Sequence, residues 1–444
     1  MVGVNFKSMP CFEYLHTLFK PSDFPYLVLM TQPNLSKHKL LTDPALKRLW
    51  TALDETKLDA TRLVGGCVRD AVLGALASDV DLSTKLLPDQ VIAACTAAGI
   101  TTVPTGIAHG TITAIVDKRP FEITTLRKDV STDGRRAKVA FTDDWHADAY
   151  RRDFTMNALY CDQDGTLFDP TGQGTEDALA GNLVFVGDPD QRIIEDHLRI
   201  LRYFRFAARF TKGALTGPAL DACARHAAAI STLSVERVWS ELKKILTASD
   251  PRAVMQAMAS TGVLAVALPE TNDMNTFNAL IDIEKSASLD VDPIQRLMAL
   301  LQRDLTIVTA FCTRLKLSSV EGDRMKAWAR DATHLVSDLS AREARQALYW
   351  MGNQTYLDRV RLAWAGDSEP RRAAQWRTML AFEGGFVAPR FLVTGTQVIA
   401  AGVAPGPAVG AVLAEVERWW VANDFIDDEL SVIERLKAVV QSLG

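Results

Sequence analysis

The chain has 444 residues, of which 48% are hydrophobic and 23% are charged, and its formal net charge is −5. This composition is ordinary for a soluble globular protein with two to four domains, and the net charge does not indicate a general nucleic-acid binder. No apolar run approaches the ~20 residues that span a bilayer, so no membrane association is expected. The six cysteines form no CxxC pair. This argues against a disulfide framework or a zinc site and predicts a cytoplasmic protein.

Residues 1–45 are read as an N-terminal extension of unknown role, although translation could also begin at Met30. From there the first half of the chain mixes short strands with helices. Asp43 and Pro44 fit the N-cap and first turn of a helix over 43–58. Strands are expected over 62–65, 80–82, 111–116, 121–127 and 167–168, and helices over 69–76 and 88–98. Residues 117–120 have the composition of a hairpin turn between two of these strands.

After Gly187 the strand-like runs end, and helical spacing of apolar residues continues almost to Gly444. The fold class expected is therefore α+β, with a head of mixed strands and helices followed by an elongated all-helical region. The charge along this region is uneven. Residues 195–244 carry nine Lys/Arg against five Asp/Glu, while 387–444 carry four against seven. A local basic surface on an acidic protein suits the binding of one specific, structured RNA better than indiscriminate binding of polyanions.

The most informative motif pairs Gly65-Gly66 with Asp79 and Asp81. Paired glycines let the backbone approach a ligand, and exposed N–H groups at a helix start can bind phosphate. On a strand, the two aspartates would leave the same face and could together hold Mg²⁺ that bridges to substrate phosphates. Alone, each motif is usually a turn or a solvated loop. Together they predict nucleotidyl transfer.

Two further segments carry candidate residues. Glu122 should lie opposite the core-facing Phe121 and Ile123, so it is either solvent-exposed or a third carboxylate directed at the metal. Arg151 and Arg152 precede Asp153. Arginine binds phosphate bidentately and carboxylate accepts from ribose hydroxyls, so this run could bind a nucleotide. The alternative is a surface cluster of ion pairs.

A helix is predicted from Glu195 to about Phe210, with Glu195, Asp196 and Arg199 on one face. Arginines at 199, 202, 205 and 209 form one stripe on an otherwise apolar helix, so the stripe should face a cleft or pair with acids. An Asp–Arg pair in a cleft could read the Watson–Crick edge of a base. A solvated stripe with helical ion pairs is the alternative.

These segments, in this order, resemble the class II CCA-adding tRNA nucleotidyltransferase and bacterial poly(A) polymerase family, within the polymerase-β-like nucleotidyltransferases. The resemblance covers roughly residue 46 to the C-terminus and is densest over 62–246. It rests on runs such as GGCVRD (65–70), DVDLST (79–84), FEITTLRKDV (121–130), RRDFTMNALY (151–160) and EDHLR (195–199).

The resemblance implies a role for each matching position. Asp79 and Asp81 would hold two Mg²⁺ ions, beside which Glu122, by its place on the strand, is the candidate third catalytic carboxylate. Residues near Asp129 to Ala149 would form a polar mobile loop linked to the change from C to A addition. Asp196 and Arg199 would hydrogen-bond the incoming base. The expected nucleotide-binding set is Gly65, Gly66, Arg69, Arg151, Arg152, Asp153, Asn157, Asp196, Arg199 and Arg202.

The function expected is template-independent addition of CMP, CMP and AMP to the tRNA 3′ end from CTP and ATP, with release of pyrophosphate. The domains expected are an extension (1–45), a catalytic head (46–186), a base-recognising neck (187–275) and a tRNA-binding body and tail (276–444). A poly(A) polymerase or a partial CC- or A-adding enzyme shares the same head motifs. A catalytically dead RNA-binding factor is a further alternative, against which the intact aspartates speak. The sequence does not indicate an oligomeric state.

Overall fold

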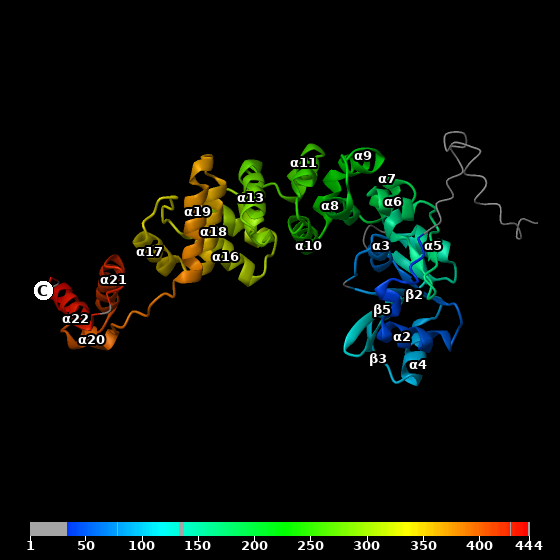
Figure 1. The fold of residues 1–444 in the computed structure, drawn as a ribbon, viewed down its shortest axis with the longest axis horizontal. Coiled ribbons are helices and arrows are strands. Elements are labelled where there is room, and N and C mark those ends of the chain that lie inside the picture. Colours follow the sequence, from blue (N-terminus) through cyan, green and yellow to red (C-terminus); the bar gives the residue numbers. More distant parts are fainter. Residues whose placement is uncertain (1–32, 78, 133–136, 427, 443–444) are drawn as a thin grey trace, which may run out of the picture. The chain divides into compact units, whose positions relative to one another are not determined.

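The computed structural model describes residues 33–442 except 78, 133–136 and 427. The chain divides into two compact units (Figure 1). The first contains the described residues up to Val130 together with Val139–Leu179, and the second contains Ser131–Lys138 and Ala180 onward. The first unit contains the strands of the main sheet. The regular elements of the second unit are helices, apart from the part of a separate two-stranded sheet that lies in Ser131–Lys138.

The first unit is built on a mixed sheet with the strand order β3-β4-β5-β2-β1-β8-β9. The central pair β2 and β5 is parallel, whereas the other neighbours are antiparallel. The strands are β1 (Thr61–Val64), β2 (Asp81–Thr84), β3 (Thr101–Gly106), β4 (Thr111–Val116), β5 (Arg119–Thr125), β8 (Tyr160–Cys161) and β9 (Leu167–Phe168). The expected mixed sheet with helices is thus confirmed.

Local signals place the helices of this unit. Asp43 accepts a hydrogen bond from the Ala45 N–H (3.0 Å), as predicted, and Pro44 begins the helix. α2 and α4 pack against each other and against the sheet through apolar residues such as Leu49. The helices are α1 (Lys39–Thr42), α2 (Pro44–Asp54), α3 (Gly66–Val72), α4 (Pro88–Ala97), α5 (Trp145–Tyr150) and α6 (Gly174–Ala180), the last of which ends at the division between the units.

The hairpin β4–β5 turns at Asp117 and Lys118, which both have positive φ (50° and 65°), as a type I′ turn requires. Two other expectations were wrong. β2 begins only at Asp81, so Asp79 precedes the strand instead of sharing it. The segment expected as a loop contains two paired strands, β6 (Arg127–Thr132) and β7 (Ala137–Phe141). The DGRR run (133–136) between them lies outside the described residues.

From Ala180 onward, the regular elements of the second unit's described residues are α-helices and short 3₁₀ turns joined by loops, apart from one isolated β-bridge. This confirms the change of character expected after Gly187. Its helices are α7 (Pro189–Glu195), α8 (Leu198–Phe210), α9 (Pro218–Arg225), α10 (Val235–Leu246), α11 (Arg252–Ser260), α12 (Val263–Ala267), α13 (Met274–Ser286), α14 (Pro293–Leu300), α15 (Leu305–Arg314), α16 (Ser319–Arg330), α17 (Ala341–Met351), α18 (Asn353–Ala365), α19 (Ala373–Gly385), α20 (Gly395–Ala400), α21 (Pro407–Ala422) and α22 (Glu429–Gln441).

The last three helices share a small apolar core with Val398, Val416 and Leu436 at its centre. This core docks on α17, where the Tyr349 hydroxyl donates to Glu417 (2.6 Å). Among the described residues, none of the helices is both long and apolar enough to cross a bilayer.

Candidate active site

Two carboxylates face each other across the central strand pair of the first unit. Asp81 on β2 and Glu122 on β5 are direct partners in the parallel register. Phe121 and Ile123 are buried, whereas Glu122 is exposed, as the alternation of the strand predicts. Burial and then the charge of Glu122 raise the pKa of Asp81 to about 6, with Asp79 adding to the rise and Arg152 opposing it. This cluster of negative charge favours a cation.

The glycine pair follows directly after β1. Gly65 has φ 73°, which a residue with a side chain adopts only under strain, and its N–H donates to the Leu159 carbonyl (2.9 Å). A Cβ placed on Gly65 would lie 3.5 Å from Nη1 of Arg152. The glycine turn and this arginine are therefore neighbours, although 87 positions separate them in the sequence.

Arg152 is held by three side chains of the same unit. Its Nη2 donates to Asp148 (2.9 Å) and to Ser83 on β2 (3.2 Å), and its Nε donates to the Tyr160 hydroxyl (3.3 Å). Arg151 binds the other oxygen of Asp148 (2.8 Å from Nε). Burial alone would raise the pKa of Asp148, but the two arginines hold it below its ordinary value. Asp148 therefore stays ionised.

Asp148, Ser83 and Tyr160 belong to this arrangement, although none was among the residues selected from the sequence. A signal for Asp148 was present, because it precedes Arg151 and Arg152 by three and four residues on α5. Ser83 and Tyr160 carried no comparable signal, since their contacts with Arg152 span the sheet.

A second polar network lies below the glycine turn. Arg69 is buried and donates from Nη1 to the Asn157 side chain (2.5 Å) and from Nη2 to Asp70 (2.7 Å). Asn157 in turn donates to Asp153 (3.1 Å), which also accepts from the Phe154 N–H (2.9 Å). Gly66 lies over this network, since a Cβ there would be 3.6 Å from Arg69 Nη2. All seven nucleotide-binding candidates of the first unit thus belong to one connected region.

The remaining candidates lie in the second unit, where the helix predicted from Glu195 to Phe210 and the predicted pairing of Asp196 with Arg199 are both wrong. Glu195 ends α7, Asp196 has an extended backbone and α8 begins at Leu198, so no single helix runs from Glu195 to Phe210. Asp196 does not pair with Arg199 through its side chain. It is bound by Arg237 of α10, with both oxygens 3.1 Å from Nη2.

The arginine stripe of α8 pairs partly with acids, one of the two outcomes expected. Arg199 Nη1 lies 2.6 Å from Glu195, confirming the i,i+4 contact, and 2.8 Å from the Arg192 carbonyl. Arg205 Nη1 lies 3.2 Å from the buried Glu241. The Arg202 guanidinium lies over the ring of Phe206, 5.6 Å from its centroid.

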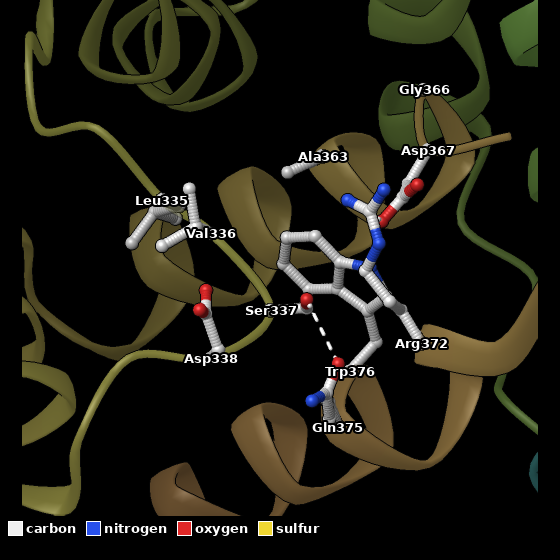
Figure 2. Close-up of a pocket in the computed structure, with 10 residues that line it drawn as sticks. All are labelled: Leu335, Val336, Ser337, Asp338, Ala363, Gly366, Asp367, Arg372, Gln375 and Trp376. Carbon is white, nitrogen blue, oxygen red and sulfur yellow. Dashed lines mark hydrogen bonds and ion pairs between the residues drawn. The ribbon is translucent and has the colours of Figure 1, made fainter. Parts of the chain in front are cut away.

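A separate pocket of about 500 Å³ opens in the second unit between α18, α19 and the loop before α17 (Figure 2). Trp376 forms one wall, and its Nε1 donates to Asp367 (2.9 Å), which also pairs with Arg372. Ser337 donates to Gln375 (3.1 Å), the residue before Trp376 on α19. None of the residues predicted from the sequence lines this pocket.

Two family models match the chain. The model described as "Poly A polymerase head domain" matches residues 61–183, and the model "Probable RNA and SrmB- binding site of polymerase A" matches residues 218–274. With the mixed sheet and its paired carboxylates, the first match shows that residues 61–183 form a head domain of the poly(A) polymerase type.

Relatives specify the family further. The chain is 33% identical to the mitochondrial CCA tRNA nucleotidyltransferase 1 of Mus musculus, over 92% of this chain and 94% of the relative. It is 30% identical to the CCA-adding enzyme of Levilactobacillus brevis, over 83% of this chain and 91% of the relative. The chain belongs to the family of CCA-adding tRNA nucleotidyltransferases.

Solved structures share the fold. The Bacillus stearothermophilus CCA-adding enzyme in complex with CTP matches with a TM-score of 0.72 and 24% identity, over 90% of this chain and 99% of that one. The Thermotoga maritima CCA-adding enzyme complexed with tRNA matches with a TM-score of 0.65 and 20% identity, over 93% and 99%. These matches confirm the expected head with a helical region after it.

Proposed function

We propose that this enzyme adds CMP, CMP and AMP to the 3′ end of tRNA, using CTP and ATP and releasing pyrophosphate. The observation that carries the proposal is the match to CCA tRNA nucleotidyltransferases along nearly their whole length. The paired Asp81 and Glu122 in the first unit support it, because nucleotidyl transfer needs clustered carboxylates beside a phosphate site.

The cofactor proposed is Mg²⁺, held by Asp79 and Asp81 with Glu122 beside them. Within the described residues, no three His, Cys, Asp or Glu side chains form a complete metal site. Carboxylates with substrate phosphates completing the shell suit Mg²⁺ well, and the register partners Asp81 and Glu122 bring two such groups together. The ion would neutralise phosphate charge and assist attack by the tRNA 3′-hydroxyl.

The other candidates divide between phosphate, sugar and base. Arg152, beside Gly65, is proposed to bind the triphosphate, with Gly66, Arg69 and Arg151 around it. Asp153, held by Asn157, is proposed to accept from the ribose hydroxyls. Asp196, together with Arg199 and Arg202 of α8, is proposed to select the base by hydrogen bonding. The domain division at 186 and 275 and the binding of tRNA by residues 276–444 complete the proposal.

A poly(A) polymerase is the second candidate, because both matching family models carry that enzyme's name. Such an enzyme must hold RNA of varied sequence. The acidic balance of residues 387–444 disfavours this, since it offers little grip on an arbitrary strand. The partial CC- or A-adding enzymes and the catalytically dead RNA-binding factor are judged by the same experiment.

The test is incubation with tRNA that lacks its CCA end, with CTP and ATP together and singly, followed by sizing of the products. We expect one product three nucleotides longer with both nucleotides, and little extension of an unstructured RNA with ATP alone. A long adenylate ladder without C incorporation would assign a poly(A) polymerase. A product that stops after CC, or one that needs a preformed CC end, would assign a partial enzyme, and no extension a binding factor.

The cytoplasmic location stays a prediction. The five cysteines within the described residues are free thiols, as a reducing compartment implies. However, the Mus musculus relative is mitochondrial by name. Fractionation of cells expressing the full chain with a C-terminal tag would assign the compartment.

A further inference from the structure

The fully buried carboxylate of Asp148 accepts hydrogen bonds from four groups, one of which belongs to Arg152 at the candidate phosphate site. Its Oδ1 accepts from Arg151 Nε (2.8 Å) and from the Arg127 N–H at the start of β6 (3.2 Å). Its Oδ2 accepts from Arg152 Nη2 (2.9 Å) and from the Tyr160 hydroxyl (2.7 Å). Two arginines thus share this carboxylate, and one of them, Arg152, borders the glycine turn.

The geometry of Arg152 shows where its charge is directed. Nε is bound to Tyr160, and Nη2 is bound to Asp148 and Ser83. Among the described residues, Nη1 has no hydrogen-bond acceptor, and it is the nitrogen that lies beside Gly65. Hydrogen bonds at Nε and Nη2 thus fix the planar guanidinium, and its remaining nitrogen, Nη1, lies beside the glycine turn.

We propose that Asp148 is a positioning residue for the nucleotide: it fixes Arg152 so that Nη1 meets the triphosphate between the glycine turn and the carboxylate pair. The inference rests on the proposed function and adds a residue to it. Asp148 does not touch the nucleotide. Without its charge, Arg151 and Arg152 repel each other, and Arg152 loses the partner that orients it.

The test is steady-state kinetics and nucleotide binding of Asp148→Asn, with Asp162→Asn as the matched control. Asp162 also pairs with an arginine of the first unit (Arg62, 2.7 Å), but that pair contacts none of the proposed site residues. We expect Asp148→Asn to raise the KM for both CTP and ATP about tenfold, the size of one charged hydrogen bond, with the KM for tRNA unchanged. The control should retain wild-type constants.

A double-mutant cycle separates positioning from a general structural role. If Asp148 acts through Arg152, then Asp148→Asn should add little to the KM of Arg152→Gln. Independent multiplication of the two effects would overturn the proposal, as would an unchanged nucleotide KM in Asp148→Asn. Tyr160→Phe, which removes one of the bonds to Arg152 and keeps the ring, should raise the nucleotide KM by a smaller factor. That variant carries the test if Asp148→Asn does not fold.

Titration with CTP alone distinguishes this proposal from the proposed function. If the wild-type enzyme extends no tRNA, and Asp148→Asn binds CTP more weakly than the wild type, the result contradicts CCA addition but supports the positioning role of Asp148. If the wild-type enzyme builds CCA, and Asp148→Asn binds CTP as tightly as the wild type, the result supports CCA addition but overturns the positioning role of Asp148.

Discussion

At the scale of single residues, the carboxylate pair gives the most direct prediction. Asp81→Ala should lower the rates of both C and A addition by a hundredfold or more, about the cost of removing one preorganised electrostatic group. Asp79→Ala should do the same, because one metal site would serve both nucleotides. Filter binding of tRNA should be unchanged. Substantial incorporation of either nucleotide by these variants would remove the aspartates from the catalytic site.

Base selection is a second prediction at this scale. Arg199→Ala should blur the choice between CTP and ATP by about 1–3 kcal/mol, the scale of one base-edge contact in protein–DNA readout. Competition between labelled CTP and ATP on tRNA lacking CCA measures this ratio. Arg209→Ala, on the same helix but outside the proposed set, is the matched control. Full selectivity in Arg199→Ala would place the base-reading group elsewhere.

At the scale of elements, two glycines should respond differently to alanine. Gly65→Ala forces a side chain into positive φ, at about 1–2 kcal/mol, but its Cβ meets Arg152 only at 3.5 Å. The variant should fold with a lowered Tm and bind CTP more weakly. Gly174→Ala would push its Cβ into the Thr155 carbonyl, so it should lose far more stability. Thermal unfolding and CTP titration of both variants check this, and equal Tm losses would contradict it.

The elements that the sequence predicted correctly carry their signals locally. The Asp43 cap, the helix after Pro44 and the turn at Asp117 each depend on neighbours within a few residues. β3 was missed because its residues are mostly exposed and include Pro104, so neither alternation nor a buried run marks it.

The errors at the candidate site have long-range causes. The break at Asp196 is stabilised by Arg237, a contact across 41 positions that helical spacing cannot reveal. Asp79 and Asp81 were expected on one face of one strand, but the pattern could not show that the strand begins only at Asp81. Strand register decided whether Glu122 is merely exposed or faces Asp81, and register depends on the whole sheet.

At the scale of the whole molecule, the helical unit depends on a buried ion pair within it. Arg296 of α14 is fully buried and binds Glu284 of α13, with Nη2 2.6 Å from Oε2. It also donates from Nη1 to the Leu246 carbonyl at the end of α10 (2.7 Å) and to the Ala248 carbonyl. One guanidinium therefore ties the helices that follow Asp196 to those of the proposed tRNA-binding body.

Arg296→Met should destabilise the second unit by about 3–5 kcal/mol, because it leaves a buried carboxylate without its partner. Adding Glu284→Gln should restore only part of this loss, since the Leu246 and Ala248 carbonyls still lack their donor. In Arg296→Met, tRNA binding should be lost at a lower temperature than in the wild type, and CTP affinity should fall with it, because Asp196, Arg199 and Arg202 lie in the second unit. Calorimetry should then show two separate transitions, whereas a single transition at the lowered temperature would mean that the two units unfold together.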